Sequence, residues 1–78
     1  MQKVKILLDS IESVKNFITV ISDYKCDMDL QYGSYIIDAR SIMGIFSLDL
    51  TKPVDLNING RENEAQEIIG QLEPYIVH

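Results

Sequence analysis

Apolar and polar residues alternate along the chain with two different periods, which predict short strands and longer helices. Over residues 11–25, apolar side chains recur every three or four positions, as along one face of a helix. Strict alternation over residues 28–32 and 54–58 indicates half-buried strands, and the β-branched and leucine-rich segment at residues 4–8 indicates another. The predicted inner face of the first helix consists of Ile11, Val14, Phe17, Ile18, Ile21 and Tyr24.

A hairpin is predicted between the second strand and the segment that follows it. Gly33 and Ser34 separate residues 28–32 from the segment at residues 35–39, which is expected to be the partner strand. Glycine suits the first central position of a two-residue turn, because that position needs a positive φ that glycine adopts without strain. We therefore expect an antiparallel pair of strands joined by this turn.

Capping signals mark where helices begin. Asp9 and Glu12 have the spacing of a capping box, and Ser10 is an equally good N-cap for the first helix. These three polar residues could also form an active pocket, but helix capping accounts for them more simply. Ser41 is the expected N-cap of a short helix over residues 41–48.

The predicted elements assemble into one architecture. A last helix over residues 61–73, ended by Pro74, completes the order β-α-β-β-α-β-α. A four-stranded sheet needs a cover for its apolar face, and the amphipathic helices supply it. We therefore expect an α+β fold, an open-faced β-sandwich with a four-stranded antiparallel sheet and the helices on one face. A single domain is expected over residues 1–78.

Composition excludes several classes of function. The 78 residues carry a formal net charge of -5, which argues against a nucleic-acid binder because phosphates need a basic surface. One cysteine and one histidine cannot form a disulfide framework or a Cys/His zinc site. No cofactor, metal or catalytic residue is predicted. Without a long apolar run for a membrane span or signal peptide, we expect a cytoplasmic protein that does not bind membranes.

Some reactive residue types have structural interpretations. Tyr24, Tyr32 and Tyr35 are interpreted as core and cross-strand packing. Cys26 is interpreted as an ordinary buried or half-buried cysteine rather than a reactive thiol.

The octapeptide Ser41-Ile42-Met43-Gly44-Ile45-Phe46-Ser47-Leu48 carries a family resemblance. It is similar to the regulatory segment of HPr, the histidine-containing phosphocarrier of the bacterial phosphotransferase system, where that segment reads S-I-M-G-V-M-S-L or nearly so. Residues 24–30 and 51–56 resemble the segments on either side in that family, and the order of elements is the same. The resemblance implies the HPr fold and protein partners within the phosphotransferase system and its regulation of sugar transport.

One departure from the family concerns its phosphate-carrying residue. HPr transfers phosphate through the histidine of a G-x-H-A-R-P motif at the start of its first helix. Residues 8–14 contain no histidine, arginine or proline, and the one histidine of this chain is His78. Depending on the alignment, the family's histidine corresponds to Ser10, Ile11 or Glu12. The resemblance therefore predicts a relative that does not carry phosphate on histidine.

Ser41 is the candidate site of regulatory phosphorylation. It matches the serine that a dedicated ATP-dependent kinase modifies in HPr. A phosphate at a helix N-cap faces free backbone N–H groups, and Arg40 adds a neighbouring positive charge. The simpler interpretation is that Ser41 only caps the helix, a contribution of about 1 kcal/mol to stability.

An apolar partner surface is predicted next to Ser41. The short helix has more apolar residues than one buried face can hold, so some must be exposed. In HPr, the residues that match Ile42 and Met43 contact partner proteins. We expect Ile42, Met43 and Phe46 to form a partner-binding patch with Arg40.

The sequence leaves two functional hypotheses. The first is a regulatory or protein-binding module, not an enzyme, that is phosphorylated on Ser41 and binds the HPr kinase or a transcriptional regulator of carbon-catabolite control. The alternative is a small α+β interaction domain without phosphorylation, which binds another protein or forms a homodimer through Ile42, Met43 and Phe46.

Overall fold

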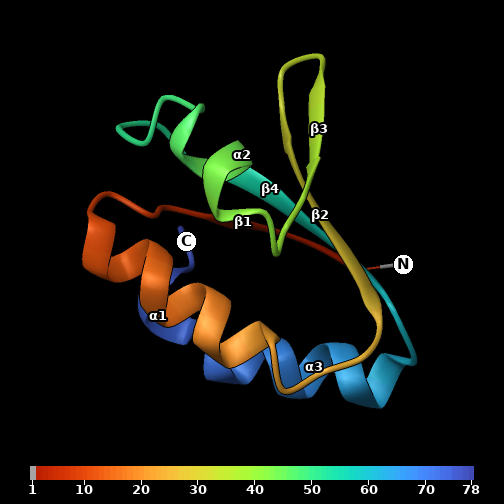
Figure 1. The fold of residues 1–78 in the computed structure, drawn as a ribbon. Coiled ribbons are helices and arrows are strands. Elements are labelled where there is room, and N and C mark those ends of the chain that lie inside the picture. Colours follow the sequence, from red (N-terminus) through yellow and green to blue (C-terminus); the bar gives the residue numbers. More distant parts are fainter. Residues whose placement is uncertain (1) are drawn as a thin grey trace.

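A four-stranded antiparallel sheet, with helices packed against one of its faces, forms the architecture of the computed structural model, which describes residues 2–78. The strand order is β1-β4-β2-β3, and Figure 1 shows α1 and α3 lying along the same side of the sheet. This arrangement confirms the predicted α+β open-faced β-sandwich. The elements are β1 (Gln2–Ile6), α1 (Ile11–Ile21), β2 (Asp27–Tyr32), β3 (Tyr35–Asp38), α2 (Ile42–Phe46), β4 (Val54–Asn59), α3 (Glu62–Gln71) and the 3₁₀ helix η1 (Glu73–Tyr75).

The core lies between the helices and the inner face of the sheet. Strand register places apolar residues opposite one another on that face, for example Leu30 opposite Leu56. The outer face carries polar pairs such as Lys5 and Asp55, whose charged atoms are 3.3 Å apart. The side chains that fill the core from both layers are Ile6, Leu8, Val14, Phe17, Ile21, Met28, Leu30, Ala39, Ile45, Val54, Leu56, Ile58, Ala65, Ile68 and Leu72.

The β2–β3 hairpin has the turn that the sequence predicts. Tyr32 pairs with Tyr35 across the turn, and Gly33 has a φ of 60°. None of the described non-glycine residues has a positive φ, so Ser34 takes the second central position with a negative φ. This combination is typical of a type II′ turn, whose twist matches that of the two strands.

Helix α1 ends four residues earlier than the pattern predicts, at Ile21 instead of residue 25. The following amides of Asp23 and Tyr24 bond to carbonyls three residues back, which tightens and ends the helix. Arg40 binds several of the carbonyl oxygens at this end, and the chain then turns into β2. The end of α1 therefore coincides with a long-range contact, which periodicity cannot reveal.

Both ends of the chain also differ from the prediction. Strand β1 covers Gln2–Ile6 rather than residues 4–8, because its pairing with β4 ends at Ile6. The C-terminal tail pairs with the other edge of β1, through bonds from the Leu7 amide to the Tyr75 carbonyl and from the Val77 amide to the Lys5 carbonyl. Helix α3 ends at Gln71, and η1 follows it.

Gly33→Ala tests the turn. We expect it to lower the free energy of unfolding by roughly 1–2 kcal/mol, because an alanine side chain clashes with its own backbone at positive φ. Urea unfolding followed by circular dichroism measures the change.

Gly70→Ala is the matched control, since Gly70 lies in α3 with nothing within 4 Å of its added Cβ. It should raise stability by about 0.5–1 kcal/mol. Equal effects of the two substitutions would contradict the turn assignment.

Candidate functional site

Ser41 begins α2 in the way that the sequence predicts. Its hydroxyl oxygen accepts a hydrogen bond from the Gly44 amide at 3.1 Å, and its carbonyl accepts one from the Ile45 amide at 2.9 Å. A Cβ at Gly44 would lie 3.0 Å from the Ser41 hydroxyl, so glycine gives the cap room to form. The side chain is therefore an N-cap at the start of a short helix, and Ser41 is half-buried.

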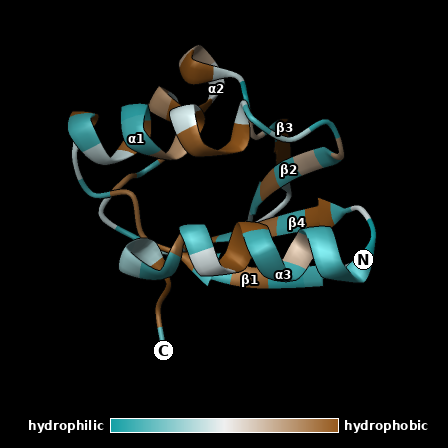
Figure 2. Cartoon of the chain, turned by 90° about the horizontal axis from the view of Figure 1, so that it is seen from below, coloured by the Kyte–Doolittle hydropathy of each residue, from teal (hydrophilic) through white to brown (hydrophobic). Residues whose placement is uncertain are grey.

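The α2 patch, which consists of Ile42, Met43 and Phe46, is exposed as expected. Met43 is 78% exposed, and Ile42 and Phe46 are each 39% exposed. Ile45 instead packs fully into the core, and Leu48 is partly buried against it. Figure 2 shows the hydrophobic colouring on this helix. The exposure is confirmed, and the role of the patch in binding a partner stays a prediction.

Arg40 lies next to Ser41 in the chain, but its side chain is engaged elsewhere. Its Nη2 is within 3.2 Å of the carbonyl oxygens of Ile21 and Cys26, and it also donates to that of Tyr24. Carbonyls at a helix end lack intrahelical partners, and a guanidinium satisfies them well. The observed bonds thus give Arg40 a structural role at the end of α1, while its predicted part in partner binding stays a prediction.

The start of α1 is capped by Ser10, which decides between the two capping patterns. Its hydroxyl oxygen accepts a hydrogen bond from the Ser13 amide at 3.0 Å and lies 2.9 Å from the Ser13 hydroxyl. Asp9 and Glu12 are exposed on either side. Ile11 is also 62% exposed, so its predicted place on the inner face of the helix is wrong. The start of α1 therefore offers two hydroxyls, those of Ser10 and Ser13, and two carboxylates.

His78 lies in the tail rather than at the start of α1. Its Nε2 is 2.9 Å from the Glu73 carboxylate, and both side chains are exposed. Because Ile76 pairs antiparallel with Ile6, the tail runs back along β1 and away from Ser10. This imidazole therefore does not take the place of the family's histidine at the start of α1.

Comparison with known proteins identifies the family. The sequence model described as the PTS HPr component phosphorylation site matches residues 13–77. The chain belongs to the HPr family. The crystal structure of HPr-C-His from Thermoanaerobacter tengcongensis is similar, with a TM-score of 0.75 and 25% sequence identity over 95% of this chain and 89% of that one.

Membership of this phosphocarrier family supports protein partners for the chain in general, since proteins of the family interact with other proteins of the phosphotransferase system. The matched range begins at Ser13 and so leaves out residues 9–12. Between residues 2 and 78 no helix is long and apolar enough to cross a membrane. Within the same residues, no three His, Cys, Asp or Glu side chains gather as metal ligands would.

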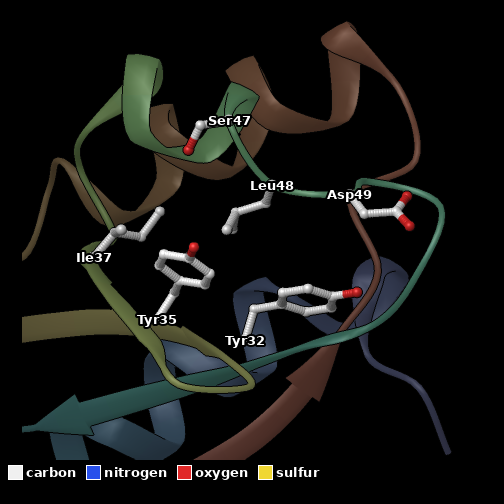
Figure 3. A pocket seen from close by; sticks show the side chains of 6 residues that line it. All are labelled: Tyr32, Tyr35, Ile37, Ser47, Leu48 and Asp49. Carbon is white, nitrogen blue, oxygen red and sulfur yellow. The ribbon is translucent and has the colours of Figure 1, made fainter.

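A pocket that the sequence did not predict lies between the hairpin end and the segment after α2. It has a volume of about 290 Å³, and Figure 3 shows its lining of Tyr32, Tyr35, Ile37, Ser47, Leu48 and Asp49. The two tyrosines are cross-strand neighbours as expected, but Tyr35 is 68% exposed and does not belong to the core. Because side chains alternate between the two faces of a strand, both rings are expected on the inner face of the sheet. The structure shows that Tyr35, at the hairpin end of this face, is not covered.

Cys26 has the character of an unreactive thiol. It is half-buried beside α3, and burial together with the Glu64 carboxylate raises the pKa of the thiol. A higher pKa leaves less thiolate, the reactive form, at neutral pH. The interpretation of Cys26 as an ordinary cysteine agrees with this environment.

Arg40→Ala tests the structural role of the guanidinium. We expect it to lower the free energy of unfolding by about 2 kcal/mol, because hydrogen bonds from a charged donor to part-buried carbonyls are lost. Chemical unfolding measures the loss.

Arg61→Ala is the control, because Arg61 is exposed and makes no side-chain capping bond at the start of α3. Its effect should stay within about 0.5 kcal/mol. If the two variants were equally stable, the assignment of Arg40 to the end of α1 would be wrong.

Proposed function

We propose that this HPr-family protein is a regulatory, protein-binding module that does not carry phosphate on histidine and is phosphorylated on Ser41. It acts in the cytoplasm and is not itself an enzyme. A contrast between two sites supports the proposal. At the start of α2, the Ser41 cap and the exposed α2 patch resemble the regulatory segment of HPr. At the start of α1, where HPr has its histidine, a serine caps the helix instead.

The chemistry at the start of α1 disfavours a phosphocarrier. An imidazole is nucleophilic near neutral pH and forms a phosphoramidate that readily passes its phosphate on. The Ser10 hydroxyl bonds to the amide and hydroxyl of Ser13 and not to a carboxylate or an imidazole, so no base is placed to take its proton. The carboxylates of Asp9 and Glu12 would repel an incoming phosphoryl group.

The chemistry at Ser41 favours modification by a kinase. The Ser41 hydroxyl would attack the γ-phosphorus of ATP, lose its proton and release ADP, forming a stable phosphate ester. The new phosphate would lie at the N-terminal end of α2, where backbone N–H groups lack helical partners. The bonds from the neighbouring Arg40 to the carbonyls near the end of α1 all use its Nη2, so the guanidinium has further N–H donors that could pair with the phosphate.

The α2 patch supplies the surface for a protein partner. Its three apolar side chains lie within the helix that Ser41 caps, so a phosphate on Ser41 would change the charge beside them. By resemblance, the partners are the HPr kinase and a transcriptional regulator of the catabolite-control kind. Binding would then depend on the modification.

Two phosphorylation reactions test this function. Phosphoenolpyruvate with the first enzyme of the phosphotransferase system should leave the protein unlabelled. ATP with the HPr kinase should add one phosphate, detected by intact mass spectrometry. Ser41→Ala should abolish that addition, and Ser47→Ala, which removes a hydroxyl at the other end of the same helix, should leave it unchanged.

Each half of the proposal has its own contrary result. Labelling from phosphoenolpyruvate would show that another residue has taken over the carrier role. An unmodified protein after incubation with ATP and an active kinase would remove the regulatory role of Ser41. Circular dichroism of Ser41→Ala checks that the loss of the cap has not unfolded the chain.

Self-association through the α2 patch is the second candidate function. The observation that favours it is the 78% exposure of Met43 between two other apolar side chains. If the patch joins two copies, Met43→Asp should convert a dimer to a monomer, because a charge would be buried in the contact. Light scattering after gel filtration measures the mass, and Gln66→Asp, at an exposed position of α3, is the control. A monomeric unmodified protein would exclude this function.

A further inference from the structure

The pocket at the end of the hairpin has the size of a site for one side chain. Its volume of about 290 Å³ lies at the lower limit for ligand pockets, which range from roughly 300 to 1,000 Å³. Tyr32 and Tyr35 come from neighbouring strands, whereas Leu48 and Asp49 come from the segment after α2. Figure 3 shows Tyr32, Tyr35 and Leu48 around the space between the two segments, with the Asp49 carboxylate at its outer edge.

The lining favours a cation. The faces of aromatic rings are electron-rich and attract positive charge, and two tyrosine rings line this pocket. Asp49 adds a carboxylate, whose Oδ1 accepts hydrogen bonds from the Thr51 hydroxyl at 2.6 Å and the Thr51 amide at 3.1 Å. Both bonds use the same oxygen, so Oδ2 remains as an acceptor. The same bonds lower the pKa of Asp49, which keeps it ionised at neutral pH.

No basic residue of the chain fills this position in the described structure. The six lining residues carry one formal charge, that of Asp49. The ion pairs found among residues 2–78 join Lys5 to Asp55 and His78 to Glu73, and neither involves the pocket. Lys52 is close enough to lower the pKa of Asp49, but it forms no salt bridge with it.

We propose that this pocket binds the side chain of an arginine presented by a partner polypeptide. A guanidinium is flat, stacks on aromatic faces and is more weakly hydrated than an ammonium, so it suits the tyrosine rings better than lysine does. It also presents several donors to the free oxygen of Asp49. The net charge of -5 would attract a basic segment of a partner.

A polypeptide fits better than free arginine. The free amino acid would bring an α-ammonium and an α-carboxylate, both strongly hydrated, to the mouth of the pocket, and the lining offers no positive group to pair with that carboxylate. Within a polypeptide that carboxylate is an uncharged amide. The inference goes beyond the proposed function and does not depend on phosphorylation of Ser41, so either can fail without the other.

Nuclear magnetic resonance titration of the full chain tests the site. The probe is arginine blocked as its N-acetyl and C-methylamide derivative, added at about 0.15 M salt so that general attraction to the acidic protein is screened. We expect saturable shifts at Tyr32, Tyr35, Leu48 and Asp49. Blocked lysine and free arginine should each bind about threefold or more weakly, and blocked norleucine should give no shifts in this region.

Two pairs of variants separate the pocket from the rest of the surface. Asp49→Asn keeps an oxygen for the Thr51 bonds but removes the charge, and Asp23→Asn removes the same charge at an exposed position after α1. Tyr35→Ala and Ile36→Ala shorten neighbouring side chains that are 68% and 62% exposed on opposite faces of β3. The first member of each pair should weaken binding about threefold or more, and the second should leave it unchanged.

Three results would overturn the proposal. One is the absence of shifts at the pocket with blocked arginine at the highest soluble concentration. Another is equal weakening by Asp49→Asn and Asp23→Asn, which would show general charge attraction. The last is blocked norleucine binding as tightly as blocked arginine, which would make the pocket an apolar hollow without a preference for cations.

Discussion

The contact of Arg40 with the end of α1 is the interaction on which the candidate site depends. The guanidinium of Arg40 binds the carbonyl oxygens of Ile21, in the last turn of α1, and of Cys26, just before β2. Arg40 directly precedes Ser41 in the chain, so these bonds also hold the residue next to the cap of α2. One side chain therefore connects the end of α1 to the start of α2. Ser41 holds the extended backbone of an N-cap, and the residue before it is held against a helix far from it in sequence.

The small size of the domain makes its exposed apolar side chains informative. A folded chain of this length buries a modest share of its surface, and each apolar residue left outside forgoes a contribution to stability. Ile45 enters the core from α2, whereas Met43 on the same helix does not. An exposed side chain of this kind, on a protein with so few apolar residues to spare, is more informative about function than it would be on a large protein.

The features that could be predicted from the sequence are those that depend on residues close together in the chain. The glycine-first turn at Gly33 and the Ser41 cap each depend on a few neighbouring residues, and both are present as the sequence indicated. The features that could not be predicted depend on contacts between residues far apart in the chain. The end of α1 coincides with the contact of Arg40, and the exposure of Tyr35 depends on how far the helices extend along the sheet. The pocket needs two segments brought together by the fold, and its signal in sequence is limited to two tyrosines flanking a turn.

The order of strands in the sheet has a consequence for how the chain folds. Strand β3 needs only a two-residue turn to pair with β2, an event on the scale of microseconds. Strand β1 pairs with β4, from Gln2 opposite Ile58 to Ile6 opposite Val54, so most of the chain must be closed into a loop before that ladder forms. High contact order of this kind slows folding, and it makes the hairpin the natural place for the sheet to begin. The two tyrosines that flank its turn would then be in contact with each other before the helices have anything to cover.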